Sequence, residues 1–312
     1  MNSKTIKIIT INMSLTELVK LQEESSIQKA ERLVFIDFRL RFLGSLNRSD
    51  LKEQFGIADA AASKELSEYK KLRPNNFSYD RVLRANTIVE AEFVPLVNIS
   101  AETALGMLAN GFNKNMLRND SMVPYQRVGI IPNKLNPDIV SKVTRAMHGK
   151  YALNCHYISA TSNNHDERLI YPTALFYDGQ SWMFRAFHPG TDMFKCFNLS
   201  RIAQANESPY TKAKPHECLE ADSDWFLTVP MELKLHPSLS QSQKVTVRKD
   251  FGVADDESTL LITEKAALVY FLIQNWKVDV KNKPSREKNY NFHLKNSDSL
   301  RCIKSIENIF KG

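Results

Sequence analysis

The sequence has little of what marks enzymes, secreted proteins or membrane proteins. It has 10 glycines in 312 residues and contains no Walker A loop, no GxSxG and no HExxH motif. No segment approaches the roughly 20 apolar residues of a membrane span, and no hydrophobic run near the start is long enough for a signal peptide. The four cysteines (Cys155, Cys196, Cys218 and Cys302) form no CxxC pair, which is typical of reduced thiols in a cytoplasmic protein. We therefore expect a cytoplasmic protein without a membrane partner.

Candidate catalytic or metal-binding residues are few and poorly placed. His165, Asp166 and Glu167 are consecutive in an expected hairpin turn, and consecutive side chains cannot all face one metal ion. An exposed acidic turn is the simpler interpretation. His156 and His188 have no carboxylate at a motif spacing. We expect no catalytic site, no metal and no cofactor, and an enzyme stays open as a minor alternative.

What the sequence does contain is a mild excess of positive charge in an ordinary globular composition. Lysine and arginine number 42 against 35 acidic residues, which gives a net charge of +7, and 43% of the residues are hydrophobic. The length is sufficient for two or three domains, each with its own core. The charge permits a polyanionic partner without requiring one.

Hydrophobic periodicity divides the chain into helices, then strands, then a mixed region. Helical patterns cover 15–43, 49–55, 59–72, 100–110 and 137–148. Strand patterns cover 150–161, 168–179, 181–189 and 193–202, with hairpin signals at Asn163-Asn164, at Asp178-Gly179 and at the HPGTD turn. Residues 224–237, 243–252 and 258–266 look like strands, and 266–276 and 298–310 like helices. We predict an α+β multidomain protein with a helical N-terminal domain at 1–115, a helical connector at 116–149, a small barrel or strongly curved sheet at 150–205, a linker at 206–224 and an α+β domain at 225–312.

The most specific pattern of the N-terminal half lies in residues 50–72. Leu51 and Phe55 share one face of a short helix, and Gly56 follows where a sharp turn between helices needs a positive φ. Asp59 is placed to cap the next helix. This spacing predicts a helix-turn-helix. A solvated pair of amphipathic helices is the alternative interpretation.

In a helix-turn-helix, the early outward positions of the second helix contact the DNA major groove. The following NNFSYDR segment would form a hairpin, the wing. The predicted DNA-binding residues are Ala61, Ser63, Lys64, Ser67, Lys70, Lys71, Arg73, Asn75 and Asn76. We expect Ser63, Lys64 and Ser67 to select the sequence, and Lys70, Lys71 and Arg73 to contribute mainly affinity.

Cations alternate with aromatic residues in the strands between Ser181 and Ile202. Arginine side chains gather against their own repulsion where an anion shares the site, because the guanidinium matches phosphate and carboxylate groups, and neighbouring aromatic rings can stack on a base. The predicted effector-binding residues are Tyr157, Ser159, Arg168, Arg185, Lys195 and Arg201. The alternative is structural: these cations pair with carboxylates such as Asp178, Asp192 or Glu167, or extend to solvent at a barrel rim.

Two segments resemble known families. GIADAAASKEL resembles the GIS-x-x-TAS-RDL pattern of winged-helix regulators, and the strands resemble the WYL domain, with WMFRAF at the namesake triplet and FKCFNLSRI as the closing strand. WMF departs from Trp-Tyr-Leu, and Thr173 follows Pro172 where close relatives are expected to carry histidine. The whole chain resembles regulators of the BrxR/CapW type.

This resemblance implies a homodimeric repressor of a phage-defence operon. It implies a winged helix-turn-helix DNA-binding domain at 1–115, an Sm/SH3-like β-barrel at 150–205 that acts as the WYL sensor, and a C-terminal extension at 225–312 used in dimerisation. The repressor would bind an inverted-repeat DNA operator and sense an anionic nucleotide or nucleic-acid effector through its WYL domain. Two-fold symmetry doubles the few base pairs that one helix reads. A nucleic-acid or nucleotide-binding accessory module without a transcriptional role is the main alternative, and an interaction protein that binds no DNA is a third.

Overall fold

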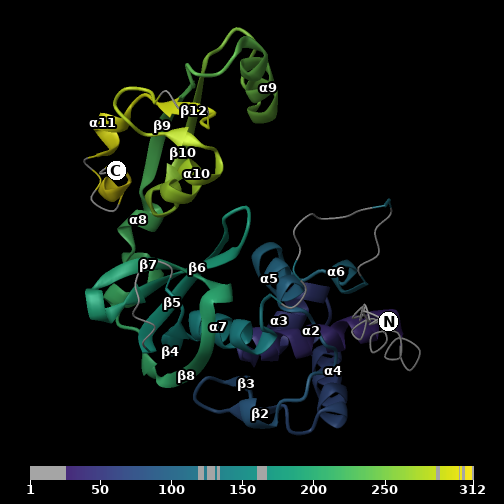
Figure 1. The fold of residues 1–312 in the computed structure, drawn as a ribbon. Helices are drawn as coiled ribbons and strands as arrows, with labels where there is room; N and C mark the ends of the chain where they lie inside the picture. The colour runs from purple at the N-terminus through teal and green to yellow at the C-terminus, as the bar shows by residue number, and fades with distance from the viewer. Residues whose placement is uncertain are drawn as a thin grey trace, which may run out of the picture. The chain divides into compact units, whose positions relative to one another are not determined.

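The computed structural model describes residues 26–118, 123–124, 131, 134–159, 167–285, 289–301, 303 and 306–310. The chain forms two compact units (Figure 1). Unit 1 contains Met1–Leu175 and Asn198–Lys212, and unit 2 contains Phe176–Phe197 and Ala213–Gly312.

Unit 1 is built around the long helix α2 (Ile27–Leu43). Ser26 caps its first turn, and Gly44 ends it at a φ of 80° with its N–H bonded to the carbonyls of Arg39 and Leu40, the left-handed end that glycine favours. Leu33, Ile36 and Leu40, spaced three and four residues apart along this helix, are fully buried. Residues 15–25 of the predicted helix lie outside the described residues.

The helix-turn-helix and the wing follow. Helix α3 (Arg48–Phe55) ends at Gly56, whose φ is 63°, and α4 (Asp59–Leu72) begins after Ala58. Strands β1 (Ser45–Leu46), β2 (Phe77–Asp80) and β3 (Ala85–Ile88) form a small antiparallel sheet in the order β1-β3-β2. This is the predicted winged helix. The predicted Asp59 cap is wrong: Ala58 occupies the N-cap without a side-chain bond, and Asp59 pairs with Lys52 at 3.1 Å instead.

Shorter helices continue unit 1 after the wing. They are η1 (Glu90–Glu92), α5 (Ala101–Asn110), α6 (Asn115–Arg118) and α7 (Pro137–Gly149). Ser100 caps α5 and Asn136 caps α7, which has proline at its first position. These are residue types that favour the start of a helix. Thr144 of α7 donates a hydrogen bond to the carbonyl of Phe42 at 2.7 Å, so α7 packs on the end of α2.

Strands β4 (Tyr151–Tyr157), β5 (Glu167–Tyr177) and β8 (Ile202–Lys212) pair antiparallel with β4 in the middle. The recorded pairings of the described strands form an open sheet without barrel closure. The linker prediction fails for its first part, because 206–212 belong to β8. Glu207 in this strand is bonded to Arg145 of α7. The polar composition of the segment gives no sign of this contact, which helps to hold the strand in place. The predicted Asn163-Asn164 turn lies outside the described residues.

Unit 2 begins with the hairpin strands β6 (Trp182–His188) and β7 (Met193–Asn198), joined by η2 (Pro189–Thr191) at the predicted HPGTD turn. A short 3-10 helix, η3 (Leu199–Arg201), leads from β7 to β8. The predicted Asp178-Gly179 turn is also present: Asp178 Oδ1 accepts the N–H groups of Gln180 and Ser181, and Gly179 has a φ of 96°.

The rest of unit 2 is an α+β domain. After η4 (Pro215–Glu217), η5 (Leu219–Ala221) and α8 (Ser223–Phe226), strands β9 (Thr228–Leu235), β10 (Thr259–Lys265), β11 (Val278–Asp279) and β12 (Phe292–Leu294) form a sheet in the order β10-β9-β12-β11. The helical pieces η6 (Ala266–Leu268), α10 (Val269–Asn275), α11 (Ser297–Leu300) and η7 (Glu307–Phe310) accompany this sheet. Leu233, Phe292 and Leu294 are fully buried in its core.

Two predictions for this domain are wrong. Residues 243–252 lie in the helix α9 (Gln241–Phe251) and at its Gly252 end instead of forming a strand. The alternation of Val245 and Val247 imitates a strand, but Ser240 and Gln243 form a capping box at the start. The single final helix is wrong too, because α11 and η7 are separate short turns.

Candidate nucleic-acid interface

Helix α4 has one buried face and one solvent-facing side. Ala62, Glu65 and Tyr69 are its buried residues. Tyr69 donates a 2.6 Å hydrogen bond to Asp37 of α2, and Arg32 of α2 forms an ion pair with Glu65 at 2.7 Å. These polar contacts orient α4 about its axis, so its opposite side faces away from α2. We call α4 the recognition helix.

The structure places most of the predicted DNA-binding residues on that outer side or just beyond the end of the helix. Lys64, Ser67, Lys70, Lys71 and Asn75 are exposed, and Ala61, Ser63 and Arg73 are partly exposed. Ser67 donates its hydroxyl to the carbonyl of Ser63 at 2.9 Å. Ser67 must therefore break this hydrogen bond before its hydroxyl donates to a base.

Two of the predicted DNA-binding residues, Asn76 and Arg73, make hydrogen bonds within the domain. Asn76 is 1% exposed; its amide donates to Tyr69 Oη and to the carbonyl of Val94, and accepts from the Val94 N–H. Asn76 therefore joins the recognition helix to the segment after the wing and is removed from the interface. The guanidinium of Arg73 donates to the carbonyls of Val94 and Pro95, which leaves less of it for phosphate contact.

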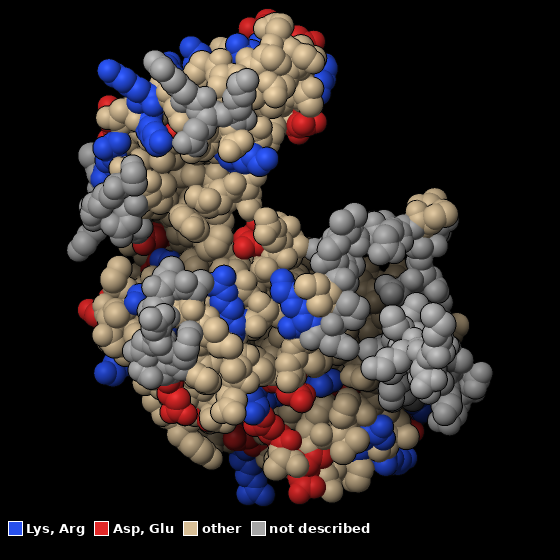
Figure 2. Space-filling model, viewed as in Figure 1, with Lys and Arg blue, Asp and Glu red and all other residues tan. Residues whose placement is uncertain are grey.

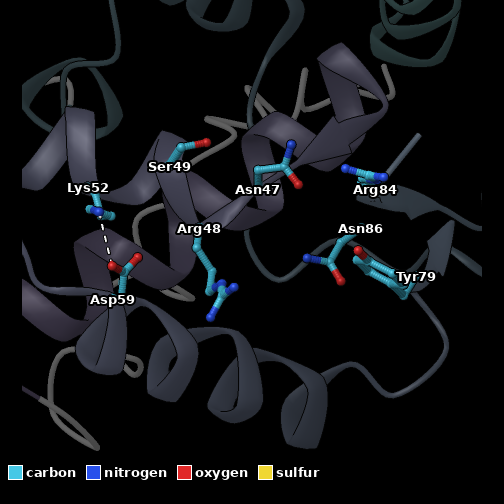
Figure 3. A pocket seen from close by; sticks show the side chains of 8 residues that line it. All are labelled: Asn47, Arg48, Ser49, Lys52, Asp59, Tyr79, Arg84 and Asn86. Carbon is cyan, nitrogen blue, oxygen red and sulfur yellow. Dashed lines mark hydrogen bonds and ion pairs between the residues drawn. The ribbon is translucent and has the colours of Figure 1, made fainter. Parts of the chain in front are cut away.

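A polar recess of about 320 Å³ lies beside the recognition helix (Figure 3). Figure 3 shows Arg48 of α3 facing Asn86 and Tyr79 of the wing, whereas Lys52 of α3 points to Asp59 of α4. Its lining also includes Asn47, Ser49 and Arg84. Two of its three cations, Arg48 and Arg84, are not balanced by a carboxylate of the lining, whereas Lys52 pairs with Asp59 at 3.1 Å. Two guanidinium groups beside several hydrogen-bonding groups suit a phosphate oxygen.

None of the recess residues is in the predicted set. The sequence carries a partial signal for them: Asn47 and Asp50 form a capping box at the start of α3, so Arg48 and Ser49 occupy its first turn, where the helix dipole favours anions. The approach of Arg84 depends on a left-handed backbone at that residue (φ of 52°), which the sequence does not indicate. Arg48 reaches the recognition helix itself, since its Nη1 lies 3.5 Å from Ser63 Oγ.

Positive charge is not concentrated in one large field on the face shown in Figure 2. Lysine and arginine side chains lie interspersed with acidic ones there. Lys29 and Lys71 both pair with Glu68 on α4, which lowers the pKa of that carboxyl through the bonds from Lys71 and Lys29. Nucleic acid would therefore meet a local set of cations around the recognition helix and the recess.

The predicted effector residues of unit 1 come together in part. The Arg168 guanidinium lies 5.3 Å from the centre of the Tyr157 ring, a cation–π geometry. Tyr157 Oη accepts the N–H of Asn198 at 3.1 Å, and the Ile158 N–H donates to the carbonyl of Arg201 at 2.9 Å. Tyr157, Arg168 and the Arg201 backbone thus lie in one region. Arg201 is exposed there and Ser159 is partly exposed.

Arg185 and Lys195 belong to unit 2, where Arg185 is in a structural ion pair. It is 5% exposed and binds Asp222 through Nε at 2.7 Å and Nη2 at 3.0 Å, with Asp224 at 3.4 Å from Nη2. The structural alternative thus holds for Arg185, with Asp222 as its partner rather than the three carboxylates expected from the sequence. Lys195 is partly exposed on β7.

A second recess of about 280 Å³ in unit 2 has a mixed lining. Arg185, Phe194 and Asp224 contribute to it, together with Met193, Ala266, Ala267, Tyr270, Ile306 and Ile309. Because Arg185 pairs with two carboxylates, this recess has no net positive charge from these groups. It is therefore a poorer site for an anion than the Tyr157–Arg168 region.

The parts of the chain that the structure describes contain no helix long and apolar enough to cross a membrane. Within the same residues, no group of three or more His, Cys, Asp or Glu side chains is arranged to hold a metal ion.

Three family models match the chain in the order of its structural parts. The BrxR transcriptional regulator winged helix-turn-helix domain matches residues 28–109, the WYL domain matches 138–207, and the BrxR transcriptional regulator C-terminal dimerization domain matches 228–300. The winged helix, the WYL strands and the C-terminal sheet described above occupy these ranges. The fold is that of a WYL-domain transcriptional regulator.

Similar proteins agree over most of the chain. A protein of Pseudomonas aeruginosa named DNA-binding transcriptional repressor CapW is 30% identical over 279 residues, which cover 87% of this chain and 90% of that protein. Proteins of the same name from Stenotrophomonas maltophilia and Escherichia coli (strain KTE188) are 33% identical (77% of this chain, 81% of theirs) and 29% identical (87% and 90%). The chain belongs to the CapW family of DNA-binding transcriptional repressors. A solved structure of the proteasome accessory factor B/C of Arthrobacter aurescens, with 15% identity over 96% of this chain and 49% of that one, has a TM-score of 0.24 and supports no argument.

Proposed function

We propose that this protein is a non-enzymatic cytoplasmic repressor that binds an inverted-repeat operator as a homodimer. The observation that carries the proposal is the recognition helix, held to α2 by Tyr69 and Glu65 with Lys64 exposed on the opposite side. One such helix reads only a few base pairs, and a C-terminal dimerisation domain supplies a second copy with two-fold symmetry.

The recess is proposed to contact the DNA backbone beside the major groove. Arg48 and Lys52 on α3 and Arg84 on the wing lie on either side of it. Phosphate contacts orient a protein on the duplex, whereas contacts to base edges select the sequence. The recognition helix and the recess would therefore divide specificity and affinity between them.

The WYL domain is proposed to sense an anionic nucleotide or nucleic acid. Tyr157 and Arg168 provide an aromatic ring and a guanidinium in contact, and Arg201 and Ser159 lie on adjoining backbone. The Tyr157 ring is 6% exposed and supports the guanidinium of Arg168. That guanidinium and the exposed Arg201 suit the phosphate of such a ligand. An effector changes DNA affinity only if it binds the two states of the repressor unequally. The regulated genes are proposed to be a phage-defence operon.

The direct test is DNA binding by a Lys64→Ala variant. An operator fragment is first selected from random duplex DNA by the wild-type protein. We expect Lys64→Ala to lose on the order of 5- to 100-fold in affinity for that operator, equivalent to ~1–3 kcal/mol. Lys249→Ala is the control, because Lys249 is an exposed lysine on α9 of unit 2. Failure to select any duplex sequence, or equal operator binding by Lys64→Ala and Lys249→Ala, would contradict the proposal.

A further inference from the structure

The tip of the wing exposes two apolar side chains between two arginines. Val82 is 91% exposed and Leu83 is 61% exposed. Arg81 and Arg84, on either side of them, are exposed as well. An exposed apolar residue is ordinary when it stands alone. Here two lie in sequence at the end of a hairpin whose base joins the recognition helix through Asn76.

The hairpin holds this tip in a defined conformation. Asp80 Oδ1 accepts the N–H groups of Val82 at 2.7 Å and Leu83 at 3.0 Å. The strand register then closes at the Asp80–Ala85 pair. Apolar side chains on an ordered turn can enter a narrow groove with little further loss of conformational entropy.

The charges around the tip identify the partner. Arg84 also lines the recess that contains Arg48 and Lys52, so cations extend from the start of α3 to the wing. Phosphates follow both edges of a DNA groove, and an apolar side chain between two arginines matches a minor groove with its phosphates on each side. A protein partner would not require cations that continue from the tip of the wing to the start of α3, beside the recognition helix.

We propose that Val82 and Leu83 form an apolar wedge that enters the minor groove and partly unstacks one base step, while Arg81 and Arg84 contact the adjacent phosphates. The bound operator is then bent at each wing. Specificity arises there without base-edge hydrogen bonds, because flexible pyrimidine–purine steps such as TA and CA are unstacked more easily than others. This inference rests on the proposed operator binding.

The test uses the full-length protein and the selected operator with 2-aminopurine placed at single positions. We expect the fluorescence of the probe to rise on binding at one step in each half-site, and fluorescence energy transfer between the operator ends to report a bend. The Val82→Ser/Leu83→Ser variant should lose both signals and on the order of 10-fold in affinity, with an unchanged salt slope. The Tyr210→Ser variant is the control, because Tyr210 is 100% exposed on β8, outside both the winged helix and the C-terminal dimerization domain.

The salt dependence of DNA binding tests the phosphate contacts of the two wing arginines separately. Arg81→Ala and Arg84→Ala should each lower the salt slope of binding by about one. Wild-type binding without unstacking or bending would overturn the wedge and leave operator binding intact, whereas no duplex binding at all would overturn the proposed function with it. A change of oligomeric state in Val82→Ser/Leu83→Ser, with normal DNA bending, would show that the tip contacts another protein copy and would also overturn the wedge.

Discussion

Arg145 of α7 pairs with Glu207 of β8, with Nε 3.0 Å from Oε1 and Nη2 close to Oε2. The same guanidinium bonds Glu90, which follows the wing, at 2.9 Å, and the carbonyl of Arg41 at the end of α2 at 2.8 Å. Bonding to Glu207 raises the pKa of Arg145 although burial opposes this. Within unit 1, one side chain therefore joins α2, the segment after the wing and a WYL strand.

Removing this guanidinium should destabilise unit 1 strongly. Arg145→Met leaves the Glu207 carboxylate, whose side chain is 7% exposed, without its cation, and such a change costs about 3–5 kcal/mol. Hydrogen exchange of the α7 and β8 amides measures the loss locally. Lys249→Met is the control, because the Lys249–Asp255 pair is exposed and worth at most about 1 kcal/mol. Equal exchange in the two variants would rule out this role for Arg145.

Asp37 should make the stability of the winged helix depend on pH. Burial raises the pKa of this carboxyl from 3.8 to about 6, against the bonds from Tyr69 and Leu96, which lower it. Its Oδ2 atom has no hydrogen-bond partner among the described residues. The folded protein therefore holds a proton that the unfolded chain releases between about pH 4 and pH 6, so this group makes folding less favourable as pH rises through that window.

The Asp37→Asn variant isolates this effect, because an amide oxygen can still accept from Tyr69 and Leu96 while nothing titrates. Relative to wild type, the free energy of unfolding of Asp37→Asn should rise by ~3 kcal/mol between pH 4 and pH 7. Urea unfolding at several pH values, followed by a probe in α4, measures it. A difference between the two proteins that is constant with pH would show that Asp37 does not titrate as described.

Asn76 and Lys70 should differ in how they affect DNA binding. Asn76→Ala removes three buried hydrogen bonds and should lower local stability by about 1–3 kcal/mol, weakening DNA binding without changing its salt slope. Lys70→Ala removes a cation that lies 5.5 Å from the centre of the Phe77 ring, which is worth at most about 1 kcal/mol, and it should lower that slope by about one. Affinity measured at several salt concentrations, together with thermal unfolding, separates them. A reduced slope in Asn76→Ala would restore it as a phosphate contact.

Substitutions of Arg185 and Arg201 should have different effects, although both residues were expected to bind effector. Arg185→Ala leaves Asp222, whose side chain is 2% exposed, unpaired, and should destabilise unit 2 by about 3–5 kcal/mol. Arg201→Ala should leave folding and operator binding intact and impair release or strengthening of DNA binding by a single-stranded DNA or nucleotide probe. Circular dichroism melting and operator titration with the probe measure both. A stable Arg185→Ala variant, or a normally responding Arg201→Ala variant, would contradict this assignment.

Local signals account for the parts of the fold that the sequence predicts. Gly56 allows the positive φ at the turn between α3 and α4. Asn136 and Pro137 begin α7, and the HPGTD turn joins β6 to β7. The errors arise where distant contacts decide. Valine alternation at 245–247 imitates a strand in α9, and the polar residue Asn76 is buried by partners brought together in the folded domain.

The candidate sites show the same limit. Exposure of Lys64 follows from helical periodicity, so the outward positions of α4 could be predicted from the sequence. Arg185 could not be assigned, because its partner Asp222 is 37 residues away in a segment that looks like a linker. The recess likewise could not be predicted, because it forms where α3 and the wing approach each other and no single stretch of sequence shows that approach.

The central claim is that two copies of the chain bind one inverted repeat, and the most direct measurement is the mass of the complex. Native mass spectrometry of the protein with its selected operator, and with the same duplex cut to one half-site, counts the chains on each DNA. We predict two chains on the inverted repeat and at least 100-fold weaker binding to the half-site, a loss of ~3 kcal/mol. One chain bound to a single half-site with full operator affinity would contradict the account.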